Sequence, residues 1–333
     1  MKRWIYVMVG VLMVGLVATP CFSFIKPGTK AMGMGGAFTA VADDISSVYW
    51  NPAGITKTGY FDLDISLAVG GENVEDLENL YNLYQAVEDK DYDAAEKIVG
   101  KINAPLGLAP TFTIGIGLFK RIALSGGLQA DFSITKFTKV DNCIKIEDTE
   151  TALVPIYLSF ARKTTENLTL GLNAKYIQAA RHQSNFNICE EDVYVEHEET
   201  ARANAFSFDV GILYQRKDSP FTLGVMVEDL LEPELKFSEG LGSMTLSRKI
   251  NIGIAYRPFP LLTLAADVHN LTDKSTLHIG GEVDLKLIKL RAGLNEGDLS
   301  LGVGLNFFLF NIQAAYYEKD KKDPYVSLVL FHM

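Results

Sequence analysis

A glycine-rich segment near the N-terminus has the residue spacing that most invites a chemical interpretation. Residues 28–44 read GTKAMGMGGAFTAVADD, and residues 48–54 read VYWNPAG. Glycine-rich loops bind nucleotide phosphates when they follow a strand and lead into a Lys-Ser/Thr pair at the start of a helix. No strand is expected before this segment, and no Lys-Ser/Thr pair follows the glycines. We therefore do not interpret the segment as a nucleotide site.

The rest of the chain offers no arrangement that predicts catalysis or metal binding. Its five histidines are scattered, and no Ser-His-Asp set or metal-ligand spacing stands out. The formal net charge of −10 also lacks the basic footprint that binding to a nucleic-acid backbone requires. We expect neither an enzyme, nor a cofactor, nor a nucleic-acid partner.

The first 23 residues are typical of an export signal. Residues 1–3 carry two positive charges, residues 4–18 are apolar, and Cys21-Phe22-Ser23 forms a small-x-small cleavage site. The alternative, an N-terminal membrane anchor, is disfavoured because the apolar stretch is short. The prediction is a signal peptide over residues 1–23.

Beyond residue 60 the sequence alternates large apolar residues with small or polar ones, which is the period of a strand with two different faces. In residues 111–119, for example, Phe112, Ile114 and Ile116 share one face, and Thr113 and Gly115 share the other. This pattern predicts about fourteen strands, at residues 60–70, 109–119, 122–137, 150–162, 167–180, 204–215, 220–229, 245–257, 261–270, 275–285, 288–295, 299–308, 310–318 and 324–331.

Connection lengths favour a membrane barrel over a soluble β-sandwich, whose strands also alternate. Short turns are expected at residues 120–121, 163–166, 216–219, 258–260 and 286–287. The intervening connections are mostly longer, at residues 71–108, 138–149, 181–203 and 230–244. Short turns on one side and long loops on the other, in an exported chain, are the pattern of a bacterial outer-membrane barrel. The predicted fold is all-β: an antiparallel transmembrane β-barrel over residues 60–333, surrounded by outer-membrane lipid.

Residues 31–54, with their glycine-rich run, Asp-Asp pair and Asn-Pro-Ala turn, resemble the N-terminal hatch of the FadL family of outer-membrane hydrophobic-compound transporters, especially its PorV-like branch. The resemblance implies a fourteen-stranded barrel plugged by residues 24–59. Asp43 and Asp44 would either cap a short helix over residues 46–49 or pair with cations in the lumen. Asn51-Pro52-Ala53 is either a simple turn or part of a gate. The hatch residues implied are Gly33, Gly35, Gly36, Asp43, Asp44, Asn51, Pro52 and Ala53.

Two features belong to the expected extracellular loops. Residues 72–104 place Leu77, Leu80, Leu83 and Tyr84 at helical spacing, which predicts a helical pair. These apolar residues either form a capture site for a ligand or pack against their own barrel. Cys143 and Cys189 lie in loops of neighbouring hairpins, so a disulfide between them is predicted in an oxidising compartment.

The polar residues expected to face the lumen form a mixed-charge set that could pair internally: Asp131, Lys175, Asp209, Asp267, His269, Glu282, Asp284, Lys289 and Arg291.

Two functions are consistent with this interpretation. The first is passive transport of hydrophobic small molecules across the outer membrane. The second is a PorV-like carrier or assembly subunit for protein secretion, with a secreted protein or a secretion system as the partner. The acidic stretches at residues 190–192 and 196–199 suit a protein partner slightly better than a fatty acid, whose carboxylate they would repel.

Overall fold

The computed structural model describes residues 26–140, 143–189, 193–238, 240–307, 310–319 and 323–332. The expected signal peptide, residues 1–23, and the acidic stretch at residues 190–192 lie outside the described residues. No helix in the described part of the chain is long and apolar enough to cross a membrane.

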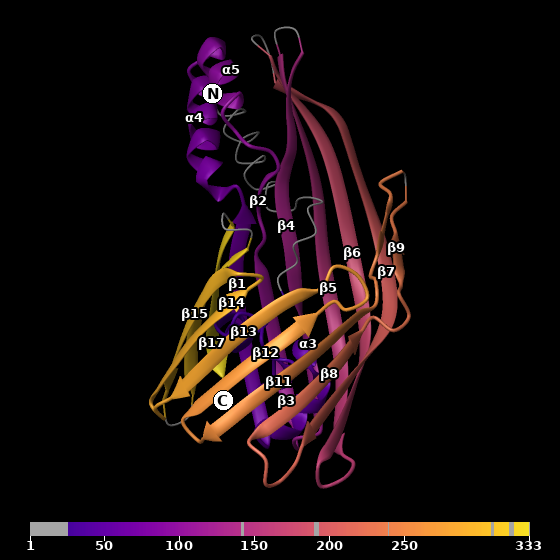
Figure 1. Ribbon diagram of the computed structural model, residues 1–333. Coiled ribbons are helices and arrows are strands. Elements are labelled where there is room, and N and C mark those ends of the chain that lie inside the picture. The colour runs from indigo at the N-terminus through magenta and orange to yellow at the C-terminus, as the bar shows by residue number, and fades with distance from the viewer. Residues whose placement is uncertain are drawn as a thin grey trace.

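Most strands belong to one antiparallel sheet that closes on itself (Figure 1). Successive strands pair along the chain, and the last strand pairs with the first, with Leu67 opposite Leu328. The strands are β1 (Phe61–Glu72), β2 (Leu106–Leu108), β3 (Thr111–Leu118), β4 (Ile122–Val140), β5 (Cys143–Lys163), β6 (Leu168–Cys189), β7 (Val193–Gln215), β8 (Phe221–Glu228), β11 (Lys249–Phe259), β12 (Leu262–His269), β13 (Thr276–Asp284), β14 (Ile288–Asn295), β15 (Asp298–Asn306), β16 (Asn311–Lys319) and β17 (Asp323–His332). Closure leaves no unpaired sheet edge, which a strand protein in lipid requires.

The count of about fourteen strands needs correction. Within the described residues the closed sheet contains fifteen strand segments, because β2 lies in the stretch 71–108 that was expected to be a loop, while β3 is the strand expected at residues 109–119. Both segments lie between β1 and β4 and follow each other along the chain. The interruption falls at Ala109-Pro110, where proline has no N–H to donate to the ladder.

Two of the expected long loops are also wrong. Residues 138–149 and 181–203 are mostly strand, because β4, β5, β6 and β7 continue well beyond the rest of the barrel (Figure 1). The pairing of β5 with β6 is unbroken from Cys143 opposite Cys189 to Lys163 opposite Thr169. Charged residues such as Glu147 and Asp148 interrupt the apolar alternation of these strands, but backbone pairing does not depend on that alternation. The loop at residues 230–244 contains a short hairpin of β9 (Glu234–Lys236) and β10 (Ser243–Thr245).

The outer face of the closed sheet is apolar and exposed. Leu124, Leu158 and Leu290 are each half exposed or more, and comparable residues occur on most other strands of the sheet. A soluble monomer rarely exposes a contiguous apolar surface of this extent, whereas a barrel in lipid requires one. Exposed aromatic pairs flank the short turns, including Tyr60 with Phe119 and Phe221 with Tyr256. These pairs occupy the place of an aromatic girdle at a membrane interface.

The insert between β1 and β2 contains the short helix η2 (Val74–Asp76) and two α-helices, α4 (Leu77–Glu88) and α5 (Tyr92–Val99). The α-helices pack on the extended strands rather than standing free. Leu83 of α4 and Ala95 of α5 are buried in one cluster with Ile144 and Ile146 of β5.

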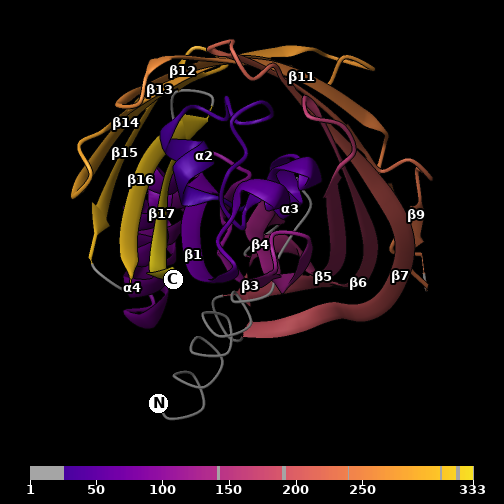
Figure 2. The same ribbon diagram turned by 90° about the horizontal axis from the view of Figure 1, so that it is seen from below.

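The segment before β1 lies inside the ring of strands, as the view along the barrel shows (Figure 2). It contains α2 (Thr29–Gly33), α3 (Ser47–Trp50) and the short helix η1 (Pro52–Lys57). Met34, Phe38, Val41, Val48 and Ile55 are fully buried there. This N-terminal segment, residues 26–59, supplies most of the apolar core inside the barrel.

Candidate functional site: the N-terminal segment inside the barrel

Strand glycines make room for the N-terminal segment. A β-carbon on Gly302 of β15 would lie 3.0 Å from the Cα of Gly33, and one on Gly293 of β14 would lie 2.5 Å from the nitrogen of Gly35. The same holds for other strands around the ring. The strand glycines that face the segment in this way are Gly171, Gly211, Gly224, Gly253, Gly280, Gly293 and Gly302. The strand faces that carry these glycines are therefore the surface on which the N-terminal segment packs.

Gly35 and Gly36 are required by both backbone conformation and space. Their φ angles are 65° and 80°, in the left-handed region that favours glycine. A β-carbon on Gly35 would lie 2.6 Å from the backbone nitrogen of Leu294, and one on Gly36 would lie 2.9 Å from Nδ1 of His278. The same His278 nitrogen lies 2.9 Å from the carbonyl oxygen of Gly35. The turn after α2 thus fits directly against β13 and β14.

Asn51 forms hydrogen bonds both within the N-terminal segment and to the strands that form the barrel wall. The residue is fully buried, and its Oδ1 accepts from the N–H of Ala53 at 3.2 Å, which caps η1. Its Nδ2 donates to the carbonyl oxygen of Thr39 at 2.8 Å and to that of Ile212 in β7 at 3.1 Å. Pro52 occupies the first turn of η1, where its missing N–H costs nothing. Asn51-Pro52-Ala53 is therefore a bridge between segment and wall as well as a turn.

The two aspartates divide the roles that were expected of the pair. Asp43 accepts from the ammonium of Lys30 at 2.9 Å. Asp44 accepts from the backbone N–H of Ser46 at 2.9 Å, directly before α3. Burial alone would raise the pKa of Asp43, but the neighbouring cations Lys30 and Lys57 hold this pKa below its ordinary value.

Charged wall residues complete the attachment of the segment. Lys30 also lies 3.1 Å from Glu282, which in turn accepts from Arg291 at 2.7 Å. A carboxylate oxygen of Asp267 accepts from the backbone N–H groups of Phe38 and Thr39 at 2.8 and 2.7 Å. The contacts of Lys30, Phe38 and Thr39 each connect an N-terminal residue to one more than two hundred positions later. The segment is thus held by ionic and polar contacts as well as by packing.

The expected luminal polar set largely pairs within itself. Lys175 lies 3.1 Å from Asp209, Lys289 lies 3.4 Å from Asp284, and His269 lies 3.2 Å from Asp267. Lys175 has a further partner, Asp229, at 2.7 Å. These pairs make a polar filling around the segment.

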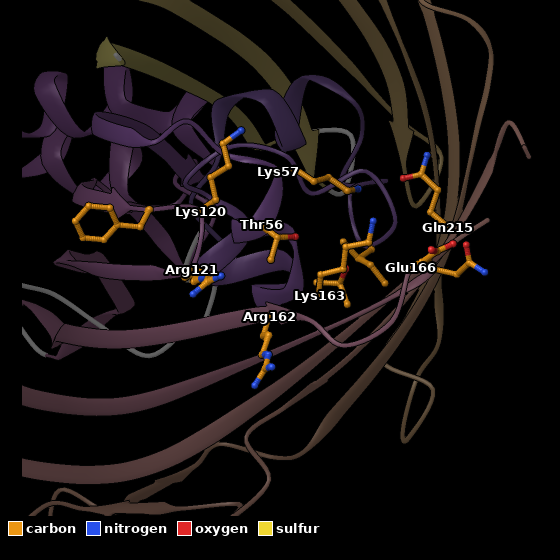
Figure 3. A pocket seen from close by; sticks show the side chains of 12 residues that line it. Thr56, Lys57, Lys120, Arg121, Arg162, Lys163, Glu166 and Gln215 are labelled. Atoms are coloured by element: carbon orange, nitrogen blue, oxygen red, sulfur yellow. The ribbon is translucent and has the colours of Figure 1, made fainter. Parts of the chain in front are cut away.

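A cavity of about 580 Å³ lies at the end of the barrel that carries the short turns (Figure 3). Thr56 and Lys57 of η1 line it, together with residues from the β3–β4 and β5–β6 turns and from β7. Burial and the nearby Arg257 lower the pKa of Lys57 to about 8. Its ammonium donates to the carbonyl oxygen of Val41 at 3.1 Å, which holds the side chain against the segment.

Comparison with known proteins agrees with this architecture. Residues 48–269 match the family described as "F plasmid transfer operon, TraF, protein". The chain belongs to this family. No curated protein matches the TraF-family chain.

Solved structures resemble the TraF-family chain at the level of the fold. The Ralstonia pickettii toluene transporter TbuX is 12% identical with a TM-score of 0.58, over 93% of this chain and 98% of TbuX. A Pseudomonas aeruginosa FadL homologue is 12% identical with a TM-score of 0.56, over 92% and 98%. The Pseudomonas putida toluene transporter TodX is 11% identical with a TM-score of 0.56, over 93% and 98%. The expectation of a FadL-type outer-membrane barrel fold is confirmed.

The eight residues expected in the hatch all belong to the N-terminal segment, but they contact different strands of the barrel, such as β15 for Gly33 and β7 for Asn51. The four suggested capture residues fare differently. Leu83 is buried and Leu80 half-buried in the cluster with β5, so both serve to hold α4 on the strands. Leu77 is more exposed, and Tyr84 is half-buried.

The TraF-family chain joins Cys143 of β5 to Cys189 of β6 in a disulfide. The two residues are directly opposite each other at the tip of the extended strands rather than in loops. What sequence reasoning missed was the cationic cavity. The dipeptides Lys120-Arg121 and Arg162-Lys163 at two neighbouring turns were the available signal.

Proposed function

We propose that this protein lets hydrophobic small molecules cross the bacterial outer membrane passively. The observation that carries the proposal is a closed barrel, apolar outside, whose interior is filled by its own N-terminal segment. The toluene transporters TbuX and TodX add support, because the likeness of their folds to this one extends over more than nine-tenths of both chains.

In this proposal residues 24–59 act as the plug, and the long-loop end faces outward. The short turns and the C-terminus then lie at the periplasmic side. A ligand passes only when the plug shifts, because apolar and polar contacts hold it on all sides. The gate positions are the hatch glycines together with Asp43, Asp44 and the Asn51-Pro52-Ala53 bridge.

A reversible disulfide cross-link, here called a staple, tests whether the plug must move. The hydroxyls of Thr29 in α2 and Ser327 in β17 lie 2.6 Å apart, so cysteines at both positions would cross-link the plug to the wall. The matched control places cysteines at Ser66 and Thr113, whose hydroxyls also lie 2.6 Å apart but join β1 to β3 within the wall. Uptake of toluene into proteoliposomes should fall when the plug staple is oxidised and recover on reduction. The wall staple should leave uptake unchanged.

A second candidate function is a carrier or assembly subunit for protein secretion, as in the PorV-like branch. The feature that favours it is the acidic, extended end of β4–β7, where Tyr194 is 49% exposed. The insert at residues 72–104 adds nine acidic and three basic residues to the same end. Such a surface suits a protein partner.

Native mass spectrometry of the protein extracted in mild detergent separates the two functions. A retained apolar molecule, on the order of a few hundred daltons, supports transport and identifies the ligand class. A retained polypeptide with no small ligand supports the carrier function and overturns the transport proposal.

A further inference from the structure

The cavity at the short-turn end has a charge opposite to that of the whole protein. The chain carries a formal net charge of −10, yet the cavity is lined by five cationic side chains and one acidic one. The charged lining residues are Lys57, Lys120, Arg121, Arg162, Lys163 and Glu166. At a volume of about 580 Å³ the cavity has the size of a small-molecule site.

The cations that line the cavity come from separate elements. Lys120 and Arg121 belong to the β3–β4 turn, Arg162 and Lys163 to the end of β5, and Lys57 to η1. In Figure 3, Lys120 and Arg121 lie on one side and Glu166 on the other, with Lys57 and Lys163 between them. The side chain of Arg162 points away from the others, so it contributes through its field rather than through contact.

These cations are not neutralised by the protein itself. Among the ion pairs of the described residues, none involves Lys120, Arg121, Arg162 or Lys163. Elsewhere in the lumen, cations such as Lys175 have two carboxylate partners. Like charges held around one concave space repel each other, and that repulsion is relieved when an anion enters.

We propose that this cavity is a binding site for a small organic anion with a phosphate or carboxylate group. Lys120, Arg121 and Lys163 supply positive charge that attracts the anionic group, while Leu213 offers apolar contact for the remainder of the molecule. Charge-assisted hydrogen bonds from ammonium and guanidinium groups suit phosphate and carboxylate oxygens. The site does not depend on what passes through the barrel.

The test is isothermal titration of the full chain in nonionic detergent with inorganic phosphate and, separately, with citrate. We expect saturable binding that weakens as ionic strength rises, because salt screens exposed charges. The double variant Lys120→Gln/Lys163→Gln should bind at least about tenfold more weakly, since charge-assisted hydrogen bonds are lost. The matched control is Lys217→Gln, an exposed lysine of the neighbouring β7–β8 turn that does not line the cavity. The electrophoretic shift of the folded barrel on heating shows that each variant folds.

Phospholipid analysis of the purified protein distinguishes the sources of the anion. An anionic phospholipid retained by the wild type and lost by the double variant assigns the site to a lipid headgroup. Binding of free phosphate or citrate without retained phospholipid assigns it to a soluble anion. The proposal is overturned if neither probe binds saturably and no anionic phospholipid is retained, or if the double variant keeps wild-type binding. These anion-binding results are independent of whether the protein retains an apolar ligand, which tests the transport proposal separately.

Discussion

Replacing Asn51 tests how the N-terminal segment is held in the barrel. Its side chain makes one cap bond to Ala53 and donates to Thr39 and Ile212. An Asn51→Ala variant loses an N-cap, worth about 1 kcal/mol. It also removes a buried donor from the Thr39 carbonyl, which costs about 2 kcal/mol. The sum, about 3 kcal/mol, corresponds to roughly a hundredfold shift toward the undocked segment.

An Asn51→Asp variant separates the cap from the bridge. Aspartate keeps the oxygen that caps η1 but replaces the donating Nδ2 by a second oxygen facing the Thr39 and Ile212 carbonyls. If the bridge matters, this variant should loosen the segment at least as much as Asn51→Ala. If only the cap matters, it should behave like the wild type.

Hydrogen exchange read by mass spectrometry measures the effect. Peptides covering residues 38–54 should exchange about a hundred times faster in Asn51→Ala, by the free-energy sum above. Peptides from β13 and β14 should keep wild-type exchange. The control is Asn82→Ala, at an exposed position of α4. The reasoning is refuted if exchange over residues 38–54 stays at the wild-type rate in both Asn51 variants.

Four further predictions concern other parts of the molecule. Gly280→Ala should prevent docking of the N-terminal segment, because the new methyl would overlap the Met34 carbonyl. Gly100→Ala at the end of α5 should be tolerated. Hydrogen exchange over residues 29–40 checks both variants. Thiol titration of the denatured, unreduced chain prepared without residues 1–23 should find no free thiol, and two free thiols would contradict the Cys143–Cys189 bridge. The pKa of Lys57 is lowered to about 8, so its Cε carbon resonance should titrate near pH 8. Because the unfolded chain keeps this proton up to the ordinary pKa of 10.5, the free energy of unfolding should rise as the pH rises from about 8 toward 10.5. A Lys57→Arg variant should lack this step. Leu83→Ala should destabilise the packing of α4 on the strands by about 3 kcal/mol. Protease should then cleave the insert while the barrel stays intact. Tyr81→Ala, at a position 61% exposed, should leave the insert resistant to protease.

The sequence alone was sufficient for the barrel and its turns because both are local signals. Alternation with a period of two is set by neighbouring residues such as Phe112 and Thr113, and the short turns at residues 120–121 and 286–287 interrupt it visibly. The helical pair of the insert is local in the same way. Where a signal was not local, the expectation failed: the strands β5 and β6 continue past their apolar stretch because each pairs with the other, as at Asp148 opposite Ser184.

Only the tertiary structure showed that the strand faces carrying glycine are the surface on which the N-terminal segment packs. Gly211 and Gly280 are separate positions in sequence, yet each faces a different part of the same N-terminal segment, Asn51 and Met34. The cationic cavity also needs the tertiary structure, since Lys57 joins Lys120 and Lys163 of two neighbouring turns only when the N-terminal segment packs inside the barrel. Closure joins strands hundreds of residues apart, and steric fit and electrostatic attraction act over distances in space rather than along the chain.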